Sequence, residues 1–91
     1  MESDPPDAAR TTPGPRYLPY TRWRMEVRNI TEADVEYVLE HYDSRRPAPP
    51  YRQAVRPSEI FIGAVRGRRL KVYVERGSNP PLIKTAVWEG D

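Results

Sequence analysis

Five basic or aromatic residues in the second half of the chain are spaced so that they can share one surface. They are Arg66, Arg69, Lys71, Tyr73 and Trp88. Guanidinium and ammonium groups bind phosphate oxygens, and aromatic rings stack on unpaired bases. We therefore predict that these residues bind nucleic acid, with RNA as the ligand. The alternatives are a solvated strand face with ordinary cross-strand ion pairs and, for Trp88, a ring that wraps the sheet edge and completes the core.

Metal-free cleavage of RNA needs two further kinds of group. Cations must stabilise the charge that develops on the phosphate, and another group must move the proton of the 2′-hydroxyl. Arginine suits the first task but stays protonated, so it is a poor base. The sequence leaves the second task open among Glu75, His41, Lys84 and Tyr73. His41 also fits a simpler role, because an imidazolium stabilises the C-terminal end of a helix.

Charge is unevenly distributed along the 91 residues. Residues 32–43 hold five carboxylates and no Lys or Arg, whereas residues 44–71 hold eight cations against Glu59 alone. The positive end of a helix dipole explains much of the acidic stretch. The basic stretch favours a polyanion or an acidic protein as the partner.

Composition argues against several other classes of site. The chain has no cysteine and one histidine, so we expect neither a disulfide nor a metal centre, and we expect no cofactor. The longest apolar run, Ile60–Val65, is too short to cross a bilayer, and the first residues do not resemble a secretory signal. We therefore expect a cytoplasmic protein without membrane contact. A chain this small leaves a homodimer open.

Two proline-rich stretches divide the chain. Residues 1–18 are rich in proline and poor in apolar side chains, which predicts a flexible tail. Residues 19–91 then form one α+β domain. Within it, residues 43–57 mix prolines with arginines and predict an extended or polyproline connection.

Two helices are expected before that connection. The first has a helical spacing of apolar residues, which predicts a buried stripe made of Tyr20, Trp23, Val27 and Ile30. Thr31 is a good N-cap for the second helix, with Asp34 at the position where a carboxylate reaches back. The predicted buried stripe of that second helix is Val35, Val38, Leu39 and Tyr42.

Three strands are expected over residues 58–66, 69–76 and 82–88, with a tight turn between the first two. In the last strand, alternation predicts Ile83, Thr85 and Val87 in the core, and Lys84, Ala86 and Trp88 outside. The predicted fold class is α+β, with two N-terminal helices packed on one face of a three-stranded antiparallel sheet. The other face of the sheet would stay open.

Together these segments resemble a bacterial family, the domain-of-unknown-function family 4258. Its opening motif is matched here by Arg24, Met25, Arg28, Ile30, Thr31, Asp34, Val35, Val38 and Leu39. Its middle strand is matched by Gly67, Arg68, Leu70, Val72 and Val74, and its closing strand by Thr85, Val87 and Trp88. The resemblance covers roughly residues 20–88. The leading His-Ala of the family falls on Tyr20-Thr21 here, so the role of that histidine is absent or passes to tyrosine.

The order of elements is similar, more distantly, to that of the RelE and BrnT toxins. This resemblance implies a RelE-like fold and a metal-free endoribonuclease that an antitoxin partner silences. It also implies phosphate-facing, catalytic roles for Arg24, Arg28, Arg68 and Lys84. For Arg24 and Arg28, ion pairs with nearby glutamates such as Glu32 or Glu36 are the competing explanation.

Two functions follow from these observations. The first is a small RNA-binding protein that, in the stronger form of the hypothesis, cleaves RNA as the toxin of a toxin–antitoxin pair. The second is a non-catalytic interaction module that docks an acidic protein through the proline-rich connection or a sheet edge.

Overall fold

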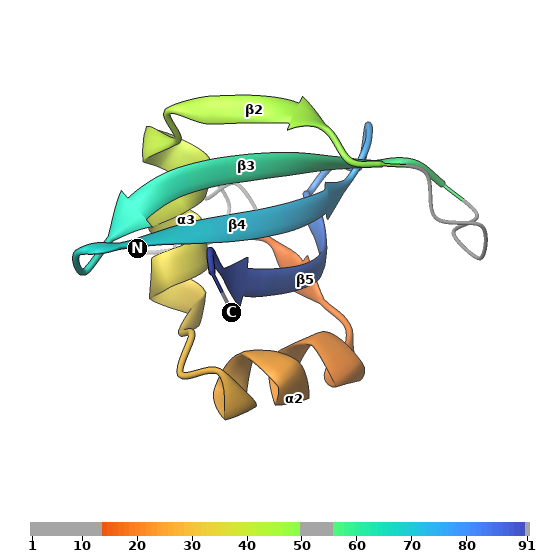
Figure 1. The fold of residues 1–91 in the computed structure, drawn as a ribbon. Coiled ribbons are helices and arrows are strands. Elements are labelled where there is room, and N and C mark those ends of the chain that lie inside the picture. Colours follow the sequence, from red (N-terminus) through yellow and green to blue (C-terminus); the bar gives the residue numbers. More distant parts are fainter. Residues whose placement is uncertain (1–13, 50–55, 91) are drawn as a thin grey trace, which may run out of the picture.

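The structure is a computed structural model that describes residues 14–49 and 56–90. The predictions for residues 1–13 and 50–55 lie outside this range. The elements are β1 (Arg16–Tyr17), α2 (Pro19–Val27), α3 (Glu32–His41), β2 (Ser44–Pro47), β3 (Ser58–Val65), β4 (Arg68–Glu75) and β5 (Leu82–Trp88). The predicted α+β class with two helices is confirmed (Figure 1).

One mixed sheet holds five strands in the order β1-β5-β4-β3-β2. The three predicted strands pair antiparallel in its centre, and β1 pairs with β5 in parallel. The predicted three-stranded antiparallel sheet is thus too small, because both edge strands were missed. β1 has only two residues, which is too short for alternation to show. β2 reads Ser-Arg-Arg-Pro, which suits an edge strand but has no apolar period.

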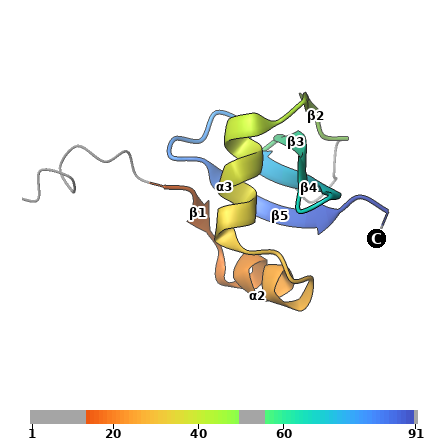
Figure 2. The same cartoon turned by 90° about the vertical axis from the view of Figure 1, so that its left-hand side faces the viewer.

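The helix α3 covers one face of the sheet, against β3 and β4 (Figures 1 and 2). Its start is fixed by the predicted capping box, in which the Asp34 amide donates to Thr31 Oγ1 at 3.0 Å and the Thr31 amide donates to Asp34 Oδ2 at 2.9 Å. Val35 and Val38 are fully buried, as predicted. Tyr42, the last residue of the predicted stripe, lies past the end of the helix and is 39% exposed.

A glycine lets α3 approach the sheet closely. Gly63 of β3 lies under the end of the helix, where an added Cβ would meet the Cα of Tyr42 at 3.4 Å and Cγ1 of Val38 at 3.6 Å. A larger side chain at Gly63 would push against backbone, which cannot move aside as a flexible side chain can.

The other helix, α2, does not pack on the sheet face. It lies beside the edge of β5, and its buried side chains are Thr21 and Met25. The predicted buried stripe is therefore wrong for Tyr20, Trp23 and Val27, which are 62%, 55% and 63% exposed. Thr21 turns inward because its hydroxyl donates to the Lys84 carbonyl at 2.9 Å, which satisfies an acceptor at the open edge of the strand.

Because of a β-bulge, the side chains in the second half of β5 lie on the faces opposite to those predicted. The pairing shifts at Tyr73/Val74, so that Val74 is opposite Ile83 while Tyr73 is opposite Thr85, and Lys84 is the extra residue. Beyond this residue the alternation is inverted. Ala86 and Trp88 lie in the core at 0% and 3% exposure, and Thr85 and Val87 are on the other side. The buried core consists of Met25, Ile30, Val35, Val38, Val65, Leu70, Val72, Val74, Ile83, Ala86 and Trp88.

Candidate nucleic-acid interface

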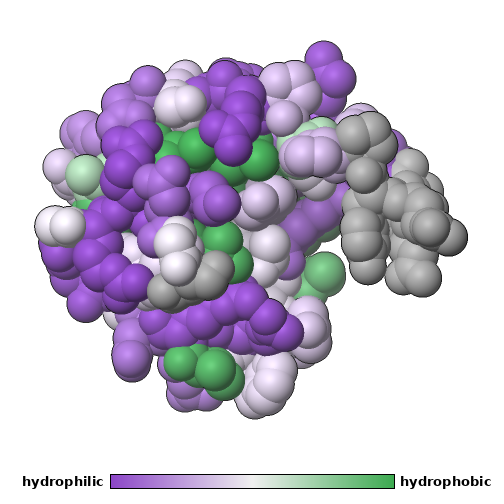
Figure 3. Space-filling view, viewed as in Figure 1, coloured by the Kyte–Doolittle hydropathy of each residue, from purple (hydrophilic) through white to green (hydrophobic). Residues whose placement is uncertain are grey.

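The face of the sheet opposite α3 carries no helix (Figure 2). Cross-strand pairing arranges its side chains in two rows, Arg46–Ile60–Tyr73–Thr85 and Ser44–Ile62–Lys71–Val87. Figure 3 looks onto this face, where hydrophilic residues dominate and apolar ones show between them. Ile60 and Ile62 are only 1% and 3% exposed, in keeping with long side chains on the neighbouring strands.

Two cations on this open face are not neutralised by neighbours. Among residues 14–49 and 56–90, no carboxylate forms an ion pair with Arg46 or Lys71. Tyr73 is half-buried and lies two residues from Lys71 along β4, in the same cross-strand row as Arg46, with Ile60 between Tyr73 and Arg46. Lys71 and Tyr73 thus lie where the sequence predicted them. Arg46 was not predicted as a site residue, because its strand was not recognised.

Arg69 belongs to the same face, but acidic groups hold it. Its guanidinium donates to both carboxylate oxygens of Asp43 at 2.9 and 3.0 Å, and its Nε lies 3.1 Å from Glu89 Oε1. The hydrogen bond from Arg69 holds the pKa of the Asp43 carboxyl below its usual value. Arg69 is therefore less suited to bind a phosphate than Arg46 or Lys71.

One flank of α2 extends this basic surface. Tyr20, Arg24 and Arg28 are spaced four residues apart, and Arg24 Nη1 donates to the Tyr20 hydroxyl at 2.9 Å. Arg28 Nη1 donates to Thr85 Oγ1 at 3.3 Å and to the Ala86 carbonyl at 3.0 Å. Because Thr85 lies on the open face, this contact joins the flank of α2 to the sheet surface.

The competing explanation for Arg24 and Arg28 was an ion pair with Glu32 or Glu36. Glu32 forms its ion pair with Arg22. The hydrogen bonds of Arg28 to β5 give it a structural role at the sheet edge, in addition to any role toward a ligand.

Trp88 does not lie on the open face, where it was predicted to stack on bases. It is 3% exposed, and its Nε1 donates to the Arg28 carbonyl at 2.7 Å. Instead it supports two arginines of the β3–β4 turn, since the guanidinium carbons of Arg68 and Arg66 lie 4.4 and 5.5 Å from its ring centroid. The physical reason for the error is the bulge at Lys84, which sends Trp88 to the core side.

Arg66 is held by the helical layer. Its Nη2 donates to the Asn29 carbonyl at 2.9 Å and to Asp34 Oδ2 at 2.6 Å. Burial tends to raise the pKa of Asp34, but hydrogen bonds from Thr31 and Arg66 outweigh it and hold that pKa below its usual value. Arg66 also has a positive φ of 52°, followed by Gly67 at 78°, as a two-residue hairpin turn of the I′ type requires.

The four residues predicted as catalytic do not form one constellation. Arg28 contacts Trp88 through its backbone carbonyl, whereas Arg68 contacts the ring through its guanidinium, and Arg24 lies one helical turn before Arg28. Lys84 is separate, because its Nζ donates to the Arg56 carbonyl at 2.8 Å, near the start of β3. The structure therefore places Arg24 and Arg28 on one flank of α2, while Arg68 lies at the start of β4 and Lys84 lies apart from both.

The candidate proton-transfer groups are also dispersed. Glu75 lies 3.7 Å from Arg56, and His41 lies 3.8 Å from Glu40 on α3, which covers the opposite face of the sheet. Within the described part of the chain, no three His, Cys, Asp or Glu side chains are arranged to hold a metal ion. None of the described helices has the length and apolar character needed to span a membrane.

Fold and surface together define a small α+β protein whose sheet has one helix-covered face and one open, basic face. Residues 21–88 match the family described as Domain of unknown function (DUF4258), so the chain belongs to this family. No curated protein and no solved structure matches the chain. The similarity to RelE and BrnT toxins stays a prediction.

Proposed function

We propose that this protein binds single-stranded RNA along one continuous surface. The surface consists of the open sheet face and the flank of α2, and it includes Arg46, Lys71, Tyr73, Arg24 and Arg28. The observation that supports it most is that Arg46 and Lys71 lie on the helix-free face of the sheet with no ion pair among the described residues. Unpaired cations on an exposed surface attract a polyanion.

Single-stranded rather than double-stranded RNA fits the shape of this surface. Tyr73 lies on the sheet and Tyr20 on the flank of α2, where it is 62% exposed. Aromatic rings on a sheet bind nucleic acid by stacking on bases, and only unpaired bases are free to stack. Lys71, the next outward residue along β4, and Arg46, two strands away, would bind the phosphates that connect such bases.

Binding is better supported than cleavage. Arg24, Arg28 and Arg68 would stabilise charge on a phosphate if this protein acts as a toxin-type endoribonuclease. That role stays a prediction, as does an antitoxin partner, because within the described residues Lys84 binds the Arg56 carbonyl, and His41 and Glu75 lie beside Glu40 and Arg56.

The test is the affinity for a fluorescein-labelled RNA of about 15 nucleotides without secondary structure, measured by fluorescence anisotropy. We expect affinity to fall steeply between about 50 and 200 mM salt. Lys71→Gln and Arg46→Gln should each weaken binding and lower the salt slope by about 0.7, since each removes one phosphate contact.

Arg76→Gln is the matched control, because Arg76 is an exposed arginine past the end of β4 and outside the proposed surface. An equal loss in all three variants would show that only net charge matters. No binding at low salt would refute the proposed function.

A further inference from the structure

The outward side of α2 carries apolar side chains that nothing in the described structure covers. We name Tyr20, Trp23 and Val27 the outer stripe. Their exposures of 62%, 55% and 63% are the three largest among the exposed large hydrophobic residues, and the rings of Tyr20 and Trp23 lie 5.9 Å apart. Large apolar side chains that are exposed together on one helix face usually mark an interaction site.

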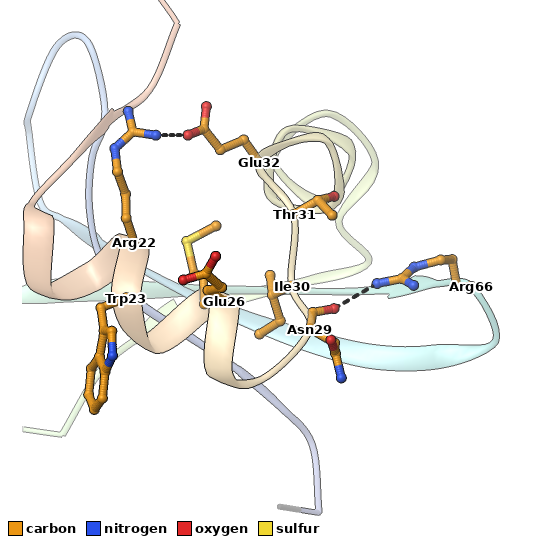
Figure 4. A pocket seen from close by; sticks show the side chains of 9 residues that line it. Arg22, Trp23, Glu26, Asn29, Ile30, Thr31, Glu32 and Arg66 are labelled. Atoms are coloured by element: carbon orange, nitrogen blue, oxygen red, sulfur yellow. Dashed lines mark hydrogen bonds and ion pairs between the residues drawn. The ribbon is translucent and has the colours of Figure 1, made fainter.

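A groove between α2 and α3 continues this stripe. Its volume is about 850 Å³, and Met25 and Ile30, which line it, are only 3% and 4% exposed. Figure 4 shows Trp23 on the α2 side of the groove, the Arg22–Glu32 ion pair on one border and the hydrogen bond from Arg66 to Asn29 on the other. The groove therefore has a small apolar floor at Met25 and Ile30, with Trp23 at its side, and otherwise polar walls.

Charge around the outer stripe indicates what could bind there. Residues 16–28 contain four arginines against Glu26 as the one carboxylate. A second copy of this chain would bring like charges together, which disfavours self-association. An acidic partner would instead place its carboxylates beside Arg24, which borders the stripe and bonds to Tyr20.

Size points to a peptide segment rather than a large globular surface. The nine residues of α2 make a helix only about 13 Å long. One face of so short a helix is too small to supply the roughly 800 Å² that each partner buries in a standard interface. RNA is the competing occupant, since Tyr20 and Trp23 carry exposed rings on which bases can stack, and the RNA measurement below distinguishes the two.

We propose that the outer stripe and the α2–α3 groove bind an acidic peptide segment of a partner protein, anchored by its apolar side chains. The apolar anchors of the peptide pack on Trp23 and Val27 and enter the groove, and its carboxylates face Arg24. This inference does not depend on RNA binding. The two surfaces meet at Tyr20 and Arg24, but Trp23, Val27 and the groove lie outside the proposed RNA surface.

The test is selection from a displayed library of random linear peptides on the whole protein, with depletion on the Trp23→Ser, Val27→Ser double variant. We expect enriched peptides to combine Asp or Glu with large apolar residues. One such peptide, made synthetically, should lose at least about tenfold in affinity with Trp23→Ser and about threefold with Arg24→Gln. Chemical-shift changes on the unaltered protein should centre on α2, which tests the site without any substitution.

Tyr37→Ser is the matched control, because Tyr37 is an aromatic residue of α3 with 48% exposure that lies outside the groove lining. It should leave peptide affinity unchanged. Three results would overturn the proposal: no enrichment over the double variant, enrichment of peptides without acidic residues, or a dimer in sedimentation that Trp23→Ser abolishes. A loss of RNA affinity in Trp23→Ser as large as in Lys71→Gln would assign the stripe to RNA instead.

Discussion

At the scale of single residues, Asp34 connects more of the structure than any motif in the sequence indicated. Its carboxylate caps α3 through the Thr31 amide and also accepts from Arg66 of the β3–β4 turn. The capping role could be predicted from the spacing of Thr31 and Asp34, which are local in sequence. The contact with Arg66 spans 32 residues, so no local pattern could have shown it.

Asp34→Asn should lower the free energy of unfolding by about 1–2 kcal/mol at neutral pH, because an amide accepts more weakly than a carboxylate. The folded-state pKa of Asp34 is below its unfolded value of 3.8. The unfolded chain therefore binds more protons, so this stabilisation is present above pH 3.8 and is lost as pH falls through the folded pKa. Denaturant titrations at pH values above and below 3.8 should measure this effect. The free energy of unfolding should fall less with decreasing pH in Asp34→Asn than in the unaltered protein.

Asp43→Asn serves as the comparison for this acid effect. The pKa of Asp43 is also lowered, by its hydrogen bond with Arg69, but this carboxylate is exposed. If the loss of stability at low pH persisted in Asp34→Asn and disappeared in Asp43→Asn, the assignment of this loss to Asp34 would be wrong.

At the scale of elements, helices and central strands could be located from sequence, but the orientation of α2 and of the second half of β5 could not. The capping box, the stripe of α3 and the three long strands were predictable, since each is a local pattern of apolar or capping residues. The rotation of α2 depends on Thr21 reaching the carbonyl of Lys84, and the facing of Trp88 depends on the bulge. Both depend on contacts between distant segments.

Thr21→Val should therefore destabilise the protein although it replaces a buried polar side chain by an apolar one of similar shape. It leaves the Lys84 carbonyl without its donor in a part-buried site, at a cost of about 1–3 kcal/mol. Thr21→Ser keeps the hydroxyl and should lose less. Thermal unfolding of the two variants side by side measures this, and equal stability of Thr21→Val and the unaltered protein would contradict the role of the hydrogen bond.

At the scale of the whole molecule, the sheet has two edges that are protected in different ways. The β5 edge pairs with β1 and is then covered by α2, whose Thr21 and Arg28 donate to strand carbonyls. The β2 edge has no strand beside it in the described structure. Its protection is chemical, because a four-residue strand with two arginines and a terminal Pro47 is a poor template for another strand.

Replacing these features should promote association of whole molecules through the sheet. Arg45→Thr, Pro47→Val makes β2 a better strand, because Val donates a backbone hydrogen bond that proline lacks. We expect concentration-dependent oligomers in sedimentation velocity. Lys71→Thr, on the interior strand β4, is the control and should stay unchanged, while a monomeric double variant would contradict this account of the edge.

The candidate interface was only partly predictable, because it too depends on contacts between segments that are distant in sequence. Lys71 and Tyr73 lie on the open face because β4 alternates without interruption. Arg46 was missed with its strand, and Trp88 was placed on the wrong side by one inserted residue. The chemistry of each side chain could be predicted from its residue type, but the face of the sheet on which the side chains of β5 lie could not.

The inserted residue Lys84 has a further consequence for how this strand tolerates changes in length. If Lys84 were deleted, Thr85 would follow Ile83 directly, and Ala86 and Trp88 would keep their inward positions by simple alternation. Related chains can therefore lack this residue and retain the same core. What they would give up is the carbonyl that anchors Thr21, so the shorter version of the strand would hold its first helix less firmly.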